Sequence, residues 1–379
     1  MKYRIPYNVP YLPRALDHLT SVVERRQVSG HGYFTDRCQE FFGHLYQTDT
    51  LLTSSCTDAL EMTALLAHIE PEDEVIMPSF TFTSTANAFV LRGARIIFAD
   101  TQDHYPNMDP DKLEELITPR TKAIVCVHYA GVACEMDKLV ALVDHHGLIL
   151  IEDAAHAVSA YYKDRLLGTF GRFATISFHE TKNITAGEGG LLIVNNPADM
   201  DRAHILWEKG TDRVAFHRGQ KQKYKWVDVG SSFLPSELNA AVLYGQLESF
   251  EMIQQQRIEL WNHYYERLLP LQEKGLIRLP VIPPYATING HLFYLECNTN
   301  GTRNDLIRYL SHYGIQSVFH YLPLHLSPFY IKRHDGRRLN NSVRFSETIL
   351  RLPLYYDLSR DDQDLIIDCI YKFHACTCT

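Results

Sequence analysis

A lysine and an aspartate follow two predicted strands at positions where their side chains could meet in one cavity. Lys182 comes after the expected strand Ala174–Phe178, and Asp153 comes directly after the expected strand Leu148–Glu152. Parallel strands end at one edge of a sheet, where open α/β proteins bind ligands. A lysine amine condenses with the aldehyde of pyridoxal 5′-phosphate (PLP), while a carboxylate keeps the pyridine nitrogen protonated so that the ring accepts electrons. The pair therefore predicts PLP chemistry, which neither residue indicates alone.

A run of small polar residues, Thr53-Ser54-Ser55-Cys56-Thr57, directly precedes the expected helix Asp58–Ile69. Hydroxyl and backbone N–H groups would converge there on the positive end of a helix dipole, which is typical of a phosphate site. Simple N-capping by Ser55 or Thr57 is the alternative, and it is the simpler interpretation of the run alone. Together with Lys182 and Asp153, the run favours a site for the cofactor phosphate.

Two aromatic residues and a histidine could complete a site for a flat ring. Phe80 and Phe82 follow the expected strand Glu74–Met77, so one of them could stack on the ring. Aromatic residues at this spacing also suit a hydrophobic core. His156 comes three residues after Asp153 and could reach the same cavity, the alternative being an ordinary surface histidine.

Basic residues crowd into one segment of an otherwise acidic chain, interleaved with Phe216, Tyr224 and Trp226. They are Arg213, His217, Arg218, Lys221, Lys223 and Lys225. A solvated loop is the default interpretation of such a charge run. The aromatic residues make a pocket for a pyrophosphate or a carboxylate an equally good hypothesis.

The pattern of elements around these residues predicts an α/β fold with a mostly parallel sheet, because short β-branched runs alternate with amphipathic stretches from about residue 50 to residue 195. The helices expected between the strands include Ala59–Ile69 and Met136–His145. The expected strands are Glu74–Met77, Arg95–Ala99, Ala123–Val127, Leu148–Glu152, Ala174–Phe178 and Leu191–Val194.

The alternation breaks near residue 250, which predicts a large domain over residues 1–250 and a smaller C-terminal α/β domain over residues 251–379. The smaller domain is expected to hold a small mixed sheet with helices packed on it. Its expected elements are the helices Glu248–Leu269 and Arg303–Tyr313 and the strands Leu292–Cys297 and Ile315–His320.

Composition excludes several classes of function. The 379 residues carry a formal net charge of −8, which argues against a nucleic-acid-binding protein. Neither a signal peptide nor an apolar stretch near the ~20 residues needed to span a bilayer is visible, so a cytoplasmic protein without a membrane partner is expected. The eight cysteines include no Cys-x-x-Cys pair and predict no disulfide framework. His374, Cys376 and Cys378 are weak evidence for a metal site, and none is expected.

Several long motifs, in order along the chain, resemble the sugar-nucleotide aminotransferases of the DegT/DnrJ/EryC1/StrS family. These motifs are Thr53–Leu60, Pro78–Gly93, His128–Asp137, Phe178–Asn183, Glu208–Thr211, Asp228–Ser232, His320–His325 and Arg351–Tyr356. The resemblance runs from near the N-terminus to about residue 360 and implies the PLP-dependent fold type I, the aspartate aminotransferase-like fold. Within the family, the motifs are most similar to those of the enterobacterial transaminases that make dTDP-4-amino-4,6-dideoxygalactose.

The resemblance implies a role for each matching residue. Lys182 becomes the Schiff-base lysine, Asp153 the partner of the pyridinium nitrogen, and His156 a partner of the ring oxygen. Phe82 becomes the aromatic over the ring, which leaves Phe80 to packing. The phosphate end is assigned to Ser55, Cys56 and Thr57, with Ser177 nearby. Ser232 stands where many relatives place an asparagine from the neighbouring subunit, so a homodimer with shared active sites is implied.

The implied reaction transfers the amino group of L-glutamate to a nucleotide-linked keto sugar for a cell-surface polysaccharide such as lipopolysaccharide. The most similar relatives act on dTDP-4-keto-6-deoxy-D-glucose. A UDP-linked 4-keto-arabinose or a 3-keto-6-deoxyhexose remains an alternative, as does a non-catalytic sensor of the same fold. A dehydratase of this fold would replace the lysine by histidine, and Lys182 argues against it. The substrate residues expected are Arg218, Lys223, His320, Tyr321 and His325.

Overall fold

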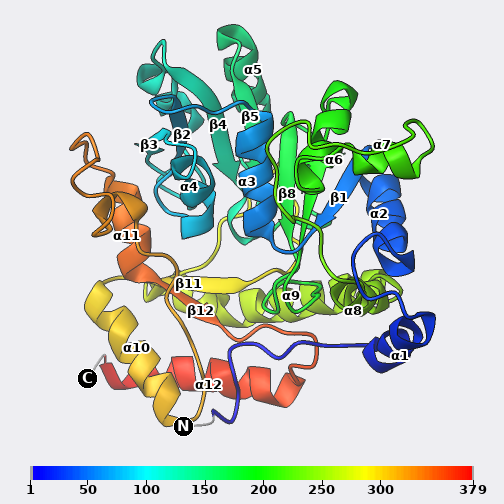
Figure 1. The fold of residues 1–379 in the computed structure, drawn as a ribbon. Coiled ribbons are helices and arrows are strands. Elements are labelled where there is room, and N and C mark those ends of the chain that lie inside the picture. Colours follow the sequence, from blue (N-terminus) through cyan, green and yellow to red (C-terminus); the bar gives the residue numbers. More distant parts are fainter. Residues whose placement is uncertain (1–2, 378–379) are drawn as a thin grey trace.

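A mostly parallel sheet forms the centre of the larger unit of the protein (Figure 1). The computed structural model describes residues 3–377, and within them the sheet has seven strands. In spatial order they are β1 (Asp49–Thr53), β9 (Gly190–Val194), β8 (Phe173–Ser177), β5 (Ile149–Asp153), β4 (Thr121–Val127), β2 (Glu74–Pro78) and β3 (Arg95–Ala99). Neighbours from β8 to β3 are parallel, whereas β9 is antiparallel to both β1 and β8. The predicted α/β fold with a mostly parallel sheet is confirmed.

Helices cover both faces of this sheet, so its inner strands are buried throughout, as the continuous apolar runs require. One hydrophobic cluster contains Ile76 of β2, and the cluster on the other face contains its neighbours Val75 and Met77. The second cluster packs under α3 (Cys56–Leu66), α4 (Thr83–Val90) and α6 (Met200–Trp207). The first packs under α1 (Ala15–Arg25), α2 (Tyr33–Tyr46), α5 (Met136–His146) and α8 (Glu237–Leu247).

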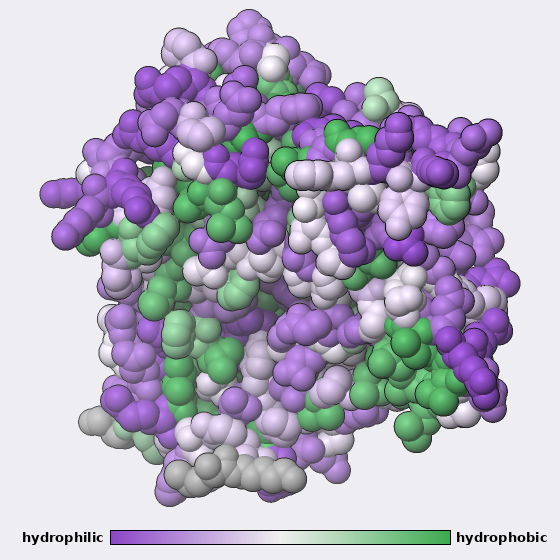
Figure 2. Space-filling view, in the orientation of Figure 1, coloured by the Kyte–Doolittle hydropathy of each residue, from purple (hydrophilic) through white to green (hydrophobic). Residues whose placement is uncertain are grey.

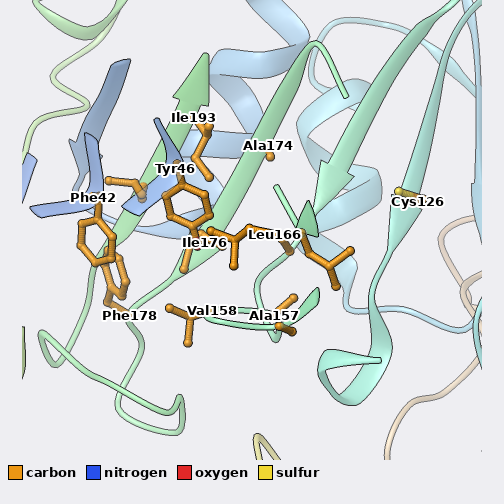
Figure 3. Close-up of a cluster of buried hydrophobic side chains, with 14 of the residues drawn as sticks. Phe42, Tyr46, Cys126, Ala157, Val158, Leu166, Ala174, Ile176, Phe178 and Ile193 are labelled. Atoms are coloured by element: carbon orange, nitrogen blue, oxygen red, sulfur yellow. The ribbon is translucent and has the colours of Figure 1, made fainter. Parts of the chain in front are cut away.

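Part of the first cluster fixes the segment that leads to Lys182. The rings of Phe42 on α2 and Phe178, which directly follows β8, stack with their centroids 5.1 Å apart (Figure 3). Phe178 also holds the end of the lysine loop, because its backbone N–H donates to Gly189 and its carbonyl accepts from Ala186. The loop between β8 and β9 is therefore anchored at both ends.

A smaller unit lies below the large sheet in Figure 1 and has its own hydrophobic core. Its sheet, β10-β11-β12, is antiparallel throughout, so the expectation of a mixed sheet is wrong. The strands are β10 (Ile277–Arg278), β11 (Phe293–Cys297) and β12 (Ile349–Leu352). The helices of this unit are α9 (Phe250–Glu273), α10 (Asn300–His312), α11 (Asn340–Thr348) and α12 (Arg360–Thr377).

Two predicted features of the smaller unit differ in the structure. No strand forms over Ile315–His320, because this segment pairs only at single points, Ile315 with Ile5 and Val318 with Arg351. Ile5 is fully buried in the core of the smaller unit, so the N-terminal segment does not pack wholly with the larger one. Cys378 lies outside the described residues.

The remaining elements are short. They are the hairpin of β6 (Tyr161–Tyr162) with β7 (Arg165–Leu166), α7 (Arg213–His217), and several single-turn 3-10 helices. Among the helices formed by residues 3–377, none combines the length and the apolar character that crossing a bilayer requires.

Candidate active site

A cavity of about 450 Å³ opens at the carboxyl ends of the parallel strands and reaches the smaller unit. It brings together Lys182 after β8, Asp153 at the end of β5 and the first residues of α3. Ten of the residues singled out in the sequence line it: Ser55, Cys56, Thr57, Phe82, Asp153, His156, Ser177, Lys182, His320 and Tyr321.

Asp153 is held in one orientation at the floor of this cavity, with 5% of its surface exposed. The hydroxyl of Thr85 donates to Oδ2 at 2.7 Å, and the backbone N–H of Ala155 donates to Oδ1 at 3.2 Å. Burial raises the pKa of this carboxyl, while the two hydrogen bonds and the nearby Lys182 act in the opposite direction. A cationic N–H in the cavity would be a strong partner for such a carboxylate.

Lys182 projects from a loop that is itself pinned. The next residue, Asn183, donates through Nδ2 to the carbonyl of Asn289 at 2.7 Å and to Oε1 of Gln254 at 3.0 Å. Burial lowers the pKa of the Lys182 amine to about 8, although Cys56 and Asp153 oppose the shift. The amine therefore has a larger neutral, nucleophilic fraction near neutral pH than an ordinary lysine has.

The N-terminus of α3 presents unused donors to the cavity. Ser55 is the N-cap, and its hydroxyl accepts from the N–H of Asp58 at 3.0 Å. Cys56 and Thr57 are the first helical residues, so their N–H groups have no intrahelical acceptor. The hydroxyl of Thr57 also lies 2.8 Å from that of Ser84, which lines the same cavity. This arrangement suits a phosphate group.

His156 is a neutral imidazole directed into the cavity. Its Nδ1 accepts from the N–H of Ala130 at 3.3 Å, which places the proton on Nε2, 3.3 Å from the hydroxyl of Tyr321. Burial holds the pKa of His156 well below its usual value, and the neighbouring cation of Lys182 lowers it further. His291 stacks on its other side with the centroids 4.2 Å apart.

The two phenylalanines occupy different environments. Phe82 lines the cavity with 55% of its surface exposed, so one face of its ring is open to a ligand. Phe80 is fully buried and packs against Tyr129 and Phe345.

Four of the predicted residues do not line this cavity. His325 is buried, with Nδ1 at 2.7 Å from the hydroxyl of Ser79. Arg218, Lys223 and Ser232 are exposed elsewhere on the larger unit, and Arg218 contacts His204. A single chain therefore does not unite all of the expected site residues.

Other residues of the site escaped the sequence interpretation. Thr85 lies in the run after β2, in which only the aromatic residues suggest a ligand site. Its distance from Asp153 along the chain does not predict the hydrogen bond between them. His291 comes from the smaller unit, and Asn289 beside it donates to the carbonyl of His156 at 2.8 Å. His179 and Glu188 line the cavity on either side of the lysine loop.

A buried cluster beside Asp153 has a structural explanation. Ligand atoms of Cys126, His128 and Cys134 lie within 4.8 Å of one another, which is close enough for a metal ion. However, Nε2 of His128 bonds to Glu152 at 3.0 Å, and its Nδ1 accepts from the N–H of Cys134 at 3.2 Å. Both ring nitrogens are used, so the cluster fixes the end of β5 next to Asp153.

The sequence matches a family of aminotransferases along most of its length. The sequence model of the DegT/DnrJ/EryC1/StrS aminotransferase family matches residues 14–371. The spore coat polysaccharide biosynthesis protein SpsC of Bacillus subtilis is 32% identical over 376 residues, which cover 97% of this chain and 96% of SpsC.

Solved structures show the same similarity. The aminotransferase TlmJ from Streptoalloteichus hindustanus superposes with a TM-score of 0.91 at 26% identity, over 99% of this chain and all of TlmJ. The PLP form of the putative sugar aminotransferase Spr1654 from Streptococcus pneumoniae has a TM-score of 0.87 at 25% identity, over 97% of this chain and 98% of Spr1654.

Proposed function

The chain belongs to the DegT/DnrJ/EryC1/StrS aminotransferase family, and on that premise we propose that it is a PLP-dependent transaminase of fold type I acting on a nucleotide-linked keto sugar. L-glutamate is the proposed amino donor. The observation that most supports this function is the convergence of Lys182, Asp153 and the N-terminus of α3 on one cavity. Neither a sensor nor a simple binding protein needs a buried amine with a pKa of about 8 beside an oriented carboxylate.

The residues of the cavity fit PLP. Lys182 would hold the aldehyde carbon. Asp153 would accept a hydrogen bond from the pyridine N–H through carboxylate lone pairs that Thr85 and Ala155 do not occupy. Ser55, Cys56 and Thr57, with Ser177 near them, would hold the phosphate at the N-terminus of α3. His156 would donate from Nε2 to the ring oxygen, and Phe82 would cover one face of the ring.

When bound, the cofactor supplies an electron sink for the breaking Cα–H bond of the donor. The protein moves the proton. Lys182 Nζ would act as the base that accepts the proton from Cα of the donor and as the acid that gives the proton back. Asp153 would hold the ring nitrogen as an anion, and the hydroxyl of Thr85 keeps its carboxylate oriented. The same groups then act in the reverse direction on the keto sugar.

The proposed acceptor is dTDP-4-keto-6-deoxy-D-glucose, with dTDP-4-amino-4,6-dideoxy-D-galactose as the product. The motifs shared with the transaminases that make this amino sugar support the proposal, and the name of SpsC links a relative to polysaccharide biosynthesis. His320 and Tyr321 line the mouth of the cavity on the side of the smaller unit, where they could contact the sugar.

We place Arg218, Lys223 and Ser232 in the site of a second copy of the chain, which would make the protein a homodimer. All three are exposed and lie outside the cavity of their own chain. The same segment exposes Trp226, with 82% of its surface open, as well as Val229. Figure 2 shows a further group of hydrophobic residues over α1, where Leu16 and Val23 are exposed. Apolar surface of this kind is typical of a subunit interface.

Product analysis tests the function. The purified protein with PLP, L-glutamate and the dTDP-linked, UDP-linked and GDP-linked keto sugars should form a 4-amino sugar from the dTDP substrate, identified by NMR. Lys182→Ala should show no visible absorbance from lysine-bound cofactor and no turnover, whereas Lys163→Ala on the surface should match the wild type. An unchanged rate in Lys182→Ala would exclude the proposed mechanism.

A further inference from the structure

Two groups of side chains bring three possible metal ligands together in the part of the chain that the structure describes. One is the buried cluster beside Asp153, whose imidazole is already bonded through both ring nitrogens. The other lies on the surface, and its ligand atoms also lie within 4.8 Å of one another. The members of this surface cluster are Glu114, His145 and His146.

The imidazoles of the surface cluster are not committed to other parts of the protein. Neither the ring of His145 nor that of His146 makes a hydrogen bond within residues 3–377, and Nε2 of His146 lies 3.4 Å from Oε1 of Glu114. The two rings are nearly perpendicular, at 87°, with their centroids 4.8 Å apart. The lone pairs of two imidazoles and a carboxylate therefore remain available to a cation, unlike those of the buried cluster.

The separation of these atoms suits a zinc ion. In a tetrahedral site, imidazole nitrogen and carboxylate oxygen lie about 2.0–2.2 Å from Zn²⁺, which puts two such ligands about 3.3–3.5 Å apart. Nε2 of His146 and Oε1 of Glu114 already have this separation. His145 has a ligand atom within 4.8 Å of both, so a rotation of its exposed side chain brings it to the same ion. Two imidazoles and one carboxylate are a known zinc donor set, with a fourth position left to water.

The two elements that carry the cluster are fixed relative to each other. The 3-10 helix Glu114–Leu116 supplies the carboxylate, and both histidines end α5. These elements pack through Leu116 and Leu139, which belong to one buried hydrophobic cluster. Nearby, Nζ of Lys138 on α5 donates to both carboxylate oxygens of Asp111, at 2.8 and 2.9 Å. Little backbone ordering is therefore needed when an ion binds.

The end of α5 also favours positive charge. The histidines occupy its last turn, where the unpaired carbonyls of a helix carry a partial negative charge. Only one of these carbonyls, that of Val143, is capped by the N–H of Gly147. A cation held by His145 and His146 would lie at this negative end, so the helix dipole supports the same ligand as the side chains.

We propose that Glu114, His145 and His146 form a binding site for a divalent transition-metal cation such as Zn²⁺. Imidazole nitrogen favours such ions over Mg²⁺ and Ca²⁺, which take oxygen ligands. Because β4 begins at Thr121 and β5 at Ile149, the site lies at the amino ends of the parallel strands. The catalytic cavity lies at their carboxyl ends, about 16 Å of strand away. The ion would therefore link the 3-10 helix to α5 and stabilise the fold, and it would take no part in amino transfer.

Calorimetric titration with Zn²⁺ tests the site in the PLP-loaded protein, prepared without a histidine tag. The wild type should bind one equivalent that Cu²⁺ displaces and Mg²⁺ does not. His145→Ala and His146→Ala should each raise the Kd of this equivalent at least about tenfold, because each removes a direct ligand. Glu114→Gln should raise it as well, since an amide oxygen carries no charge.

His104→Ala is the matched control. His104 is also an exposed histidine beside a carboxylate, with Nδ1 3.9 Å from Oδ2 of Asp103, but no third ligand joins this pair among the residues that the structure describes. This variant should bind Zn²⁺ like the wild type. In thermal unfolding, Zn²⁺ should raise the Tm of the wild type and of His104→Ala, and it should leave that of the double variant His145→Ala/His146→Ala unchanged.

A zinc equivalent that persists with unchanged Kd in the double variant would overturn the site, and so would a wild type that binds no Zn²⁺. All three ligands are on the surface, so the variants should fold. Amino transfer should be the same in the double variant and the wild type, and its loss would contradict a site remote from the cavity. The site does not rest on the proposed function, because a protein that binds Zn²⁺ through these residues but gives no spectral change with glutamate would sustain it and refute the transaminase.

Discussion

The hydroxyl of Thr85 donates to Oδ2 of Asp153 at 2.7 Å, and this hydroxyl lies 2.9 Å from that of Thr81. A short chain of hydroxyls from α4 and the preceding loop therefore fixes the carboxylate at the end of β5. Since burial raises the pKa of Asp153 and Thr85 lowers it, the threonine helps to keep this carboxyl anionic.

Replacing Thr85 by valine should weaken catalysis without preventing cofactor binding. The variant loses one hydrogen bond to a charged group, worth about 1.5–3 kcal/mol, so kcat should fall roughly 10- to 100-fold. The pKa of Asp153 should rise at the same time, and turnover should become more sensitive to acid. Turnover measured from pH 5.5 to 8 checks both effects.

Thr81→Val is the control for this change, because it leaves the bond between Thr85 and Asp153 intact. A much smaller loss of kcat is expected. Equal losses in the two variants would mean that the packing of α4, and not the bond to Asp153, is responsible.

Uptake of PLP by the cofactor-free protein should depend on pH through Lys182. The neutral amine is the nucleophile, and burial lowers its pKa from 10.5 to about 8, so the amine loses its proton well below the usual pH. The rate of condensation should therefore rise between pH 7 and 9, with a midpoint near 8. Visible absorbance after mixing measures this rate.

Asp153→Asn should shift this midpoint to lower pH, because the carboxylate of Asp153 raises the pKa of Lys182. Asp137→Asn, on the surface, should leave the midpoint unchanged. A flat profile from pH 7 to 9, or a midpoint near 10.5, would show that Lys182 does not experience the buried environment.

Glu237 should be important for stability and not for chemistry. It is 2% exposed, and its carboxylate accepts from the N–H groups of Gly32, Phe34 and Thr35 at 2.8–3.1 Å, at the start of α2. Glu237→Ala leaves these donors without a partner, so the free energy of unfolding should fall by about 3 kcal/mol. Urea unfolding measures the loss.

Glu251→Ala, an exposed position at the start of α9, should change the free energy of unfolding by less than about 0.5 kcal/mol. Comparable losses in the two variants would contradict a special role for Glu237.

The sequence predicts the fold and the site best where an apolar strand run is followed directly by polar residues. The apolar runs of β2, β3, β4, β5, β8 and β9 are each recognisable alone, and the polar residues at their carboxyl ends had to meet in a parallel sheet. The predicted elements of the larger unit therefore lie within a few residues of the observed ones. The strand β1, which the sequence does not predict, is as long as its neighbours but begins with the polar residues Asp49 and Thr50, and its pairing with β9 defines it.

Features that depend on contacts far apart in the chain could not be predicted. Thr85 and Asp153 are 68 residues apart, and no periodicity links them. Glu114 meets His146 only because the segments that carry them pack through one hydrophobic cluster. The segment Ile315–His320 has strand-like composition, yet it pairs at one residue with Ile5 and at one residue with Arg351, and both of these partners are distant in the chain.

The burial of Ile5 has a consequence for the order in which the molecule assembles. Ile5 pairs with Ile315 and shares its cluster with residues as distant as Phe373, so the core of the smaller unit needs segments that lie far apart in the chain. During synthesis, the sheet of the larger unit can form as soon as β9 has left the ribosome. The smaller core must wait until α12 has been synthesised as well, because contacts between distant segments close last. Residues that the cavity takes from the smaller unit, such as His320 and Tyr321, would then reach their places after Lys182 and Asp153.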